Sequence, residues 1–242
     1  MLKPFPMSIK IAKQTADEWK TRFKFLDNRE EQLNKYSTNY LALKSLLDQY
    51  ACNAFTIDCA FLPDVEYVPC VAASLLIDQG CGFGCEGDIN QLIMQRLLQG
   101  SGGKNALMGN LFENATHKDI LENTIVINHD VLPPSMACPG IKINFRDFHE
   151  TGKGSTLIAD IPRENITMGG ISYNSDSIWL SRGKVVWSED TVHCRLSVGI
   201  KVENAKRIMK ESFGHHQVFS YGDCYDALKL AAQFLKMRIV EL

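Results

Sequence analysis

Residues 79–88, with the sequence QGCGFGCEGD, constrain the fold more than any other part of the chain. Four of these ten residues are glycine, and they surround the carboxylate of Glu86. Glycine permits positive φ angles and close approach of other atoms to the backbone, so the stretch predicts a bent loop between two helices. Asp88 is a suitable N-cap for the second helix, whose positive end favours an ionised Glu86. An ionised carboxylate on an open loop indicates a ligand for a hard cation.

The same residues contain a pattern with a competing interpretation. Residues 82–87, GFGCEG, match the dinucleotide-binding pattern G-x-G-x-x-G. That pattern needs a strand in front of it, whereas the preceding residues have a helical pattern. The acidic side chain inside the loop would also repel a pyrophosphate. We therefore favour the cation-binding interpretation.

The composition is that of an ordinary globular protein. The 242 residues are 45% hydrophobic and 22% charged, enough for one large domain or two small ones. A net charge of −2 lacks the basic excess of nucleic-acid-binding proteins, and no apolar run reaches the length of a membrane span. These features predict a protein with neither nucleic acid nor a membrane as a partner.

The cysteines and the N-terminus favour a cytoplasmic protein. The eight cysteines form no C-x-x-C pair, and the first six residues, MLKPFP, lack the apolar core of a secretory signal. Scattered thiols of this kind are typical of a reducing compartment. We expect Cys81 and Cys85 to be small buried residues beside a tight loop, rather than redox or zinc-binding groups.

The first hundred residues have the pattern of alternating helices and a strand. Residues 15–18, TADE, predict a capping box in front of a helix that contains Trp19. The further elements that we expect here are a helix over 36–50, a strand over 54–59, a helix over 69–79 and a helix over 88–99. This alternation predicts an α/β arrangement.

Many short strands follow the glycine-rich junction at 101–104. We expect them over 105–112, 124–128, 141–145, 155–161, 166–172, 177–181, 184–188 and 194–202, with a hairpin turn at 181–184. Two helices, over 203–212 and 223–236, and a last strand over 237–240 complete the chain. This density of strands predicts a small antiparallel barrel.

Polar residues gather where predicted strands end. Glu113 and His129 each follow an apolar run, and His215 and His216 follow a glycine. Together with Glu86 they form a mixed oxygen and nitrogen set that suits manganese, or iron, cobalt or zinc. Each residue also has an ordinary explanation: a helix cap, a solvated loop acid, a partner for a buried carbonyl, and one surface with one core histidine.

These segments, in this order, resemble the C-terminal half of the L-fucose isomerase and L-arabinose isomerase family. Residues 84–88, GCEGD, resemble its E-G-D segment, whose glutamate binds the metal and takes part in proton transfer. Residues 111–114, LFEN, resemble the strand end with the second acidic ligand. Residues 128–130, NHD, resemble the position of a histidine ligand in arabinose isomerases. Residues 214–220, GHHQVFS, resemble the His-His segment, whose second histidine, here His216, is the ligand.

The resemblance implies a metal-dependent aldose–ketose isomerase. Glu86, Glu113, His216 and His129 would bind Mn²⁺ or another divalent cation, which would hold two neighbouring sugar oxygens and stabilise an enediolate. Glu86 and Glu113 would move a proton between C1 and C2. His216 would be oriented through its other ring nitrogen by a further partner.

The resemblance covers about residues 51–242 and leaves out the N-terminal domains of the family. In family members, which form homo-oligomers, those domains of a neighbouring subunit close the sugar pocket. We therefore expect a homo-oligomer, with a small-molecule sugar as substrate and a separately encoded N-terminal-domain partner as one way to complete the pocket. Two alternatives stay open, namely a non-catalytic metal- or sugar-binding remnant and a hydrolase that uses a metal-bound water.

For the fold we expect two units. The first is a partial α/β layer over residues 1–104, similar to the middle domain of the family. The second is a small antiparallel β-barrel-like domain with terminal helices over residues 105–242. Because the candidate ligands come from both units, the site is expected where the two meet.

Overall fold

The computed structural model describes residues 9–242. Its α-helices are α1 (Ile9–Arg22), α2 (Leu33–Gln49), α3 (Cys70–Asp78), α4 (Ile89–Gly102), α5 (His117–Leu121), α6 (Ala205–Glu211) and α7 (Tyr225–Phe234). Its strands are β1 (Lys24–Phe25), β2 (Ala54–Ile57), β3 (Gly82–Cys85), β4 (Ala106–Leu111), β5 (Thr124–His129), β6 (Asn144–Arg146), β7 (Thr156–Ile158), β8 (Asn165–Ile171), β9 (Ser177–Asp190), β10 (Leu196–Val202), β11 (His216–Tyr221) and β12 (Arg238–Glu241). Short 3-10 turns lie at Arg29–Gln32, Cys59–Phe61, Val65–Tyr67, Pro134–Met136 and Phe148–Glu150.

Two expectations concern localisation. The one on a secretory signal depends on residues 1–6, which lie outside the described residues. Within residues 9–242, no helix combines the length and the apolar character that crossing a lipid bilayer requires.

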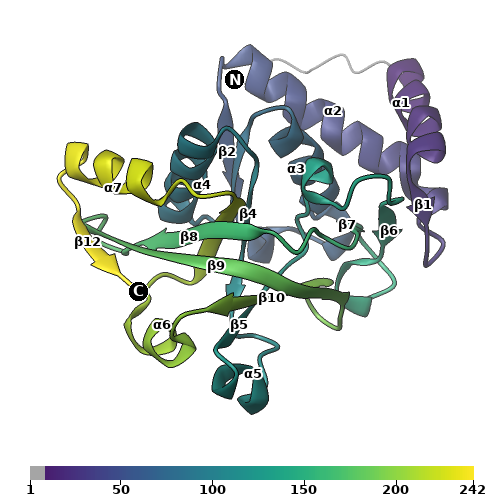
Figure 1. Cartoon of the computed structure of the whole chain (residues 1–242). Helices are drawn as coiled ribbons and strands as arrows, with labels where there is room; N and C mark the ends of the chain where they lie inside the picture. The colour runs from purple at the N-terminus through teal and green to yellow at the C-terminus, as the bar shows by residue number, and fades with distance from the viewer. Residues whose placement is uncertain (1–8) are drawn as a thin grey trace.

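A closed antiparallel barrel of six strands forms the centre of the molecule. Its strand order is β10-β5-β4-β11-β8-β9, and β9 pairs back onto β10 to close the ring. The last strand, β12, joins β9 in parallel outside the ring. Helices α1 to α3 lie on one side of the barrel strands and α5 and α6 on the other (Figure 1). The expected fold class, an α/β region followed by a small antiparallel barrel, is confirmed.

The barrel strands are buried on both faces where helices cover them. Leu107 and Phe219 belong to one apolar cluster, whereas their chain neighbours Met108 and Val218 belong to a second cluster that includes Met94 of α4. Side chains of a strand alternate between its two faces, so each strand contributes to both clusters. This double burial explains why these strands have continuous apolar sequences.

The α/β region consists of the parallel pair β2 and β3, joined through α3 and followed at once by α4. The expected loop over 79–88 is therefore partly wrong, because residues 82–85 form a strand. A Cβ atom on Gly84 would lie 2.7 Å from the carbonyl oxygen of Asp88, so this glycine lets α4 pack against β3. Positive φ angles occur further on, at Glu86 (52°) and Gly87 (77°). The pattern G-x-G-x-x-G thus begins within a strand instead of following one, unlike a dinucleotide-binding turn.

The predicted hairpin turn at 181–184 is wrong. Strand β9 continues through these residues and pairs with β8 in its first half and with β10 in its second half. A Cβ atom on Gly183 would lie 2.7 Å from Cγ2 of Ile200. Gly183 therefore serves the close approach of two strands, and one long strand closes the barrel.

Other boundaries also differ from the predicted ones. The predicted capping box at 15–18 is wrong, because α1 already begins at Ile9 and buries Ala12 one turn before Ala16. The short helix α5 and the strand β11 were not predicted. The missed strand β11 carries His216, so its absence from the prediction matters for the site.

The two predicted units are in direct contact. Strand β1 pairs in parallel with β6, with Lys24 opposite Asn144, and β6 pairs with β7. Helix α4 also packs on β4, β8 and β11. The division at residues 104 and 105 stays a prediction. The elements on either side of it share the sheet of β1, β6 and β7, and both apolar clusters contain residues from both sides.

Candidate functional site

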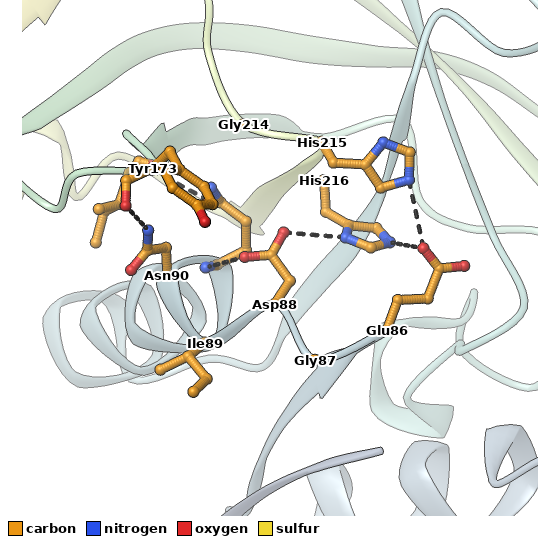
Figure 2. A pocket seen from close by; sticks show the side chains of 11 residues that line it. Glu86, Gly87, Asp88, Ile89, Asn90, Tyr173, Gly214, His215 and His216 are labelled. Carbon is orange, nitrogen blue, oxygen red and sulfur yellow. Dashed lines mark hydrogen bonds and ion pairs between the residues drawn. The ribbon is translucent and has the colours of Figure 1, made fainter. Parts of the chain in front are cut away.

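Glu86 lies at the bend between β3 and α4. Its φ angle of 52° turns the chain away from the strand, and its side chain is 43% exposed. Oε2 of Glu86 lies 3.4 Å from Nε2 of His215 and 4.0 Å from Nε2 of His216. Figure 2 shows both imidazole rings turned toward this carboxylate. The bend thus brings the carboxylate next to both histidines.

His216 is the first residue of β11 and is almost completely buried. Its Nδ1–H group donates a hydrogen bond of 3.1 Å to Oδ2 of Asp88, while Oδ1 of Asp88 accepts one of 3.0 Å from the backbone N–H of Gln91. Burial by itself would raise the pKa of Asp88, but these hydrogen bonds outweigh it and lower the pKa below its usual value. In the neutral tautomer with the proton on Nδ1, Nε2 of His216 presents its lone pair toward Glu86.

Asp88 therefore has two functions. It is the N-cap of α4, as predicted, and it also fixes the ring orientation of His216. A carboxylate that orients a histidine in this way is the usual neighbour of a metal-binding imidazole. The sequence predicted a partner for His216 without identifying it, because only the fold brings the start of α4 beside the start of β11.

His215 is exposed and His216 is buried, in agreement with the ordinary explanation of the pair as one surface and one core histidine. The side chain of His215 is 67% exposed and that of His216 is 1% exposed. His215 was not among the predicted ligands, yet its Nε2 is nearer to Glu86 than that of His216. Glu86, His215 and His216 form one group whose ligand atoms all lie within 4.8 Å of one another.

His129 ends β5 and is also buried. Its ring centroid lies 5.6 Å from that of His216, and its Nδ1 accepts a hydrogen bond of 3.0 Å from the backbone N–H of Val131. Burial, with a smaller contribution from the nearby histidines, lowers its pKa well below the usual value, so the ring is neutral. A neutral ring that accepts at Nδ1 carries its proton on Nε2. To bind a metal through Nε2, His129 would have to release the Val131 hydrogen bond.

Cys85 faces the same centre. It is buried, as predicted, but its Sγ lies within 4.8 Å of ligand atoms of both His129 and His216. It also belongs to a group with Cys59 and Glu86. A hydrogen bond with Cys59, together with burial, raises the pKa of the Cys85 thiol. Sequence reasoning missed this position because a cysteine next to a turn has no distinguishing spacing.

Glu113 lies on the same rim of the barrel but outside these groups. It is exposed in the loop after β4, and its Oε2 accepts a hydrogen bond of 3.0 Å from Nδ2 of Asn110. Asn110 pairs with His216 on one side and with Asn128 on the other. Among residues 9–242, no cluster of close ligand atoms contains Glu113. The structure thus places His216 in one group with Glu86 and in another with His129, and leaves Glu113 at the edge.

A pocket of about 390 Å³ opens beside Glu86 and His216. Its volume is within the range of small-molecule sites. Figure 2 shows the pocket-lining side chains arranged from the β3–α4 bend to the loop before β11. The lining residues are Glu86, Gly87, Asp88, Ile89, Asn90, Gln91, Ile171, Tyr173, Gly214, His215 and His216.

The donor atoms beside this pocket fit a divalent metal ion. Glu86 offers a carboxylate oxygen, and His216 offers a free Nε2 whose ring is held by Asp88. One oxygen and one or two imidazole nitrogens suit manganese, cobalt, iron or zinc. The fit of a metal ion depends on the orientation of His216. The hydrogen bond that Nδ1 donates to Asp88 directs Nε2 toward Glu86, which packing alone would not do.

Comparison with known proteins gives two matches to arabinose isomerases. Residues 9–103 match the family model of the L-arabinose isomerase central domain. An L-arabinose isomerase from Pediococcus pentosaceus is 32% identical over 89 residues, which are 34% of this chain and 19% of that enzyme. The matched region thus spans about a fifth of that relative's length. Both matches support a relationship to arabinose isomerases, and Glu86 lies inside the range of the family model while Glu113, His129 and His216 lie beyond it.

Proposed function

We propose that this chain, whose residues 9–103 match the L-arabinose isomerase central domain, carries the metal-binding part of an aldose–ketose isomerase. The observation that carries the proposal is the position of His216 between Asp88 and Glu86. Asp88 holds Nδ1, and Nε2 points toward the carboxylate at the mouth of a pocket large enough for a sugar. The proposed substrate class is L-aldoses such as L-arabinose, and L-fucose stays a second candidate.

The proposed roles follow from burial and position. His216 and Glu86 hold Mn²⁺ or another divalent cation, and His215 lies close enough to join them. When bound, such an ion supplies Lewis-acid stabilisation of negative charge on neighbouring sugar oxygens. Glu86 is the carboxylate that reaches a sugar in the pocket and moves a proton between C1 and C2. Glu113, held by Asn110 on the same rim, is proposed as the second carboxylate.

His129 is proposed to act near the ion. In its present arrangement the Nε2–H group of His129 is a hydrogen-bond donor. We therefore propose that His129 donates to an oxygen of the bound sugar instead of binding the metal. Assembly into a homo-oligomer, or with a separately encoded N-terminal domain, would close the pocket against water.

A direct test is Mn²⁺-dependent formation of ketose from L-arabinose and L-fucose. Glu86→Gln is expected to lower the rate at least about 100-fold, the usual contribution of general acid–base catalysis. Glu122→Gln is the matched control, since Glu122 is an exposed residue after α5 that pairs with Lys118. Full activity in the Glu86→Gln protein would rule out the role given to this carboxylate.

A non-catalytic binding protein is the second candidate function. It is favoured by the position of Glu113 outside the cluster of ligand atoms. Calorimetry with Mn²⁺ and each sugar separates the two functions. Binding of both without any ketose formed would favour this second candidate.

A further inference from the structure

A second cluster of potential metal ligands lies outside the pocket and consists of Asp130, His149 and Cys194. Asp130 follows β5, His149 lies in the 3-10 turn Phe148–Glu150, and Cys194 precedes β10. Nε2 of His149 lies 2.6 Å from Oδ2 of Asp130 and 3.7 Å from Sγ of Cys194. The three ligand atoms lie within 4.8 Å of one another, and the cluster shares no residue with those around Glu86 and His216.

The carboxylate of Asp130 is buried, with one oxygen satisfied and the other not. The residue is 3% exposed. Its Oδ1 accepts a hydrogen bond of 2.9 Å from the backbone N–H of Arg195, whereas Oδ2 has no hydrogen-bond partner among the described residues. Oδ2 instead lies 2.6 Å from Nε2 of His149, an ion pair when the imidazole is protonated. A buried charged oxygen is costly unless a cation, either the protonated His149 or a bound metal ion, satisfies it.

A second buried oxygen without a partner lies beside the same cluster. Nδ2 of Asn110 lies 3.8 Å from Sγ of Cys194, and Oδ1 of Asn110 is buried without a hydrogen bond. The described residues contain three such buried side-chain atoms, and these two belong to residues of this region. Two of the three thus lie in one region, where a cation would be a suitable neighbour for both oxygens.

Among the described residues, a protonated His149 is the protein cation of this cluster, and it balances one negative charge. The guanidinium of the adjacent Arg195 is engaged by three other carboxylates, those of Asp147, Glu150 and Asp190. A carboxylate, a thiolate and a neutral imidazole carry two negative charges together. A divalent ion would balance that charge and leave the buried site neutral.

The backbone holds His149 toward this point at a conformational cost. His149 and Glu150 have φ angles of 50° and 57°, two successive non-glycine residues in the left-handed region. Residues held in this region often position functional side chains. Here the strained turn places the imidazole of His149 next to the buried side chains of Asp130, after β5, and Cys194, before β10.

We propose that Asp130, His149 and Cys194 bind a divalent ion of the zinc or cobalt type. Ligands of a tetrahedral zinc ion, at about 2.0 to 2.3 Å from it, lie about 3.3 to 3.7 Å from each other. The contact between His149 and Cys194 already has this spacing, and Asp130 needs to withdraw by about 0.7 Å from Nε2. The thiol of Cys194 loses its proton to solvent as its sulfur binds. A mixed sulfur, nitrogen and oxygen set selects zinc or cobalt over manganese.

The test is a titration of the full-length, chelator-treated protein with Co²⁺, because a thiolate ligand gives cobalt a charge-transfer absorption in the near ultraviolet. His216→Asn is used as the background, which removes the proposed isomerase centre. In that background Cys194→Ser is expected to abolish the thiolate absorption and His149→Gln to weaken Co²⁺ binding at least about 100-fold. Cys52→Ser is the matched control, since Cys52 is exposed.

The alternatives give different results. Cys85→Ser separates the two thiols, and loss of the absorption in that protein alone would assign the ligand to the other centre and overturn the proposal. Two further results would overturn the proposal: no thiolate absorption in the His216→Asn protein, or an absorption that persists in Cys194→Ser. Asp130 and His149 would then form only an ion pair, and Cys194 would not bind a metal. Because Cys194→Ser is nearly isosteric, it serves as the test even where His149→Gln fails to fold. The proposed isomerase function is tested at Glu86 and does not depend on this outcome.

Discussion

The side chain of Asp88 caps α4 and also orients His216 in the proposed metal centre. Two substitutions separate its contribution to helix stability from its contribution to metal binding. Oδ1 caps α4 and Oδ2 holds Nδ1 of His216. Asp88→Asn keeps a good capping residue but removes the charge that orients the imidazole. We expect Asp88→Asn to weaken Mn²⁺ binding about 10- to 100-fold while the free energy of unfolding changes by only a few tenths of a kcal/mol.

Asp88→Ala removes both interactions. Loss of the cap is expected to lower the free energy of unfolding by about 1 kcal/mol, measured by urea denaturation in a chelator. Loss of the hydrogen bond to a buried histidine adds about 1 kcal/mol or more. Mn²⁺ binding, measured by calorimetry, should be at least as weak as in Asp88→Asn.

A second helix cap provides the control. Asn204 caps α6 through a hydrogen bond of 2.9 Å from the backbone N–H of Arg207, away from the pocket. Asn204→Ala should lower stability by about 1 kcal/mol and leave Mn²⁺ binding unchanged. Mn²⁺ binding by Asp88→Asn as tight as in the wild type would refute the argument that Asp88 prepares His216 for a metal.

Two further predictions concern stability. Burial alone lowers the pKa of His149, but the ion pair with Asp130 outweighs burial and raises the pKa. The stability that this pair contributes is therefore fully present below the unfolded-state pKa of about 6.5. It is lost as the pH rises through the higher pKa of the folded state. In a chelator, the difference in unfolding free energy between wild type and His149→Gln should shrink with rising pH, and a constant difference would contradict the ion pair. Gly84→Ala should destabilise by about 1 to 3 kcal/mol because its Cβ meets the Asp88 carbonyl, whereas Gly100→Ala, with open space around it in α4, should stabilise by about 0.5 to 1 kcal/mol in thermal unfolding.

The local pattern of the sequence determined several features by itself. Apolar residues at helical spacing predicted α2 and α4, because the helical repeat fixes which residues face the core. The density of short strands separated by turns predicted the barrel. Asp88 was predicted as a cap because capping depends only on the next three residues. One surface and one core histidine were an ordinary explanation of the pair at 215 and 216, and the burial of the two side chains agrees with it.

Tertiary structure decided the rest, because it depends on contacts between residues far apart in the chain. Gly183 and Gly84 have the local appearance of turn residues, but packing against Ile200 and Asp88 makes them positions of close approach. No spacing rule links Asp88 to His216 or Asp130 to Cys194, since the first pair meets when α4 packs on β11 and the second when β5 pairs with β10. The sequence therefore contained most of the donor atoms in recognisable segments, and the fold alone determined which of them share one point in space.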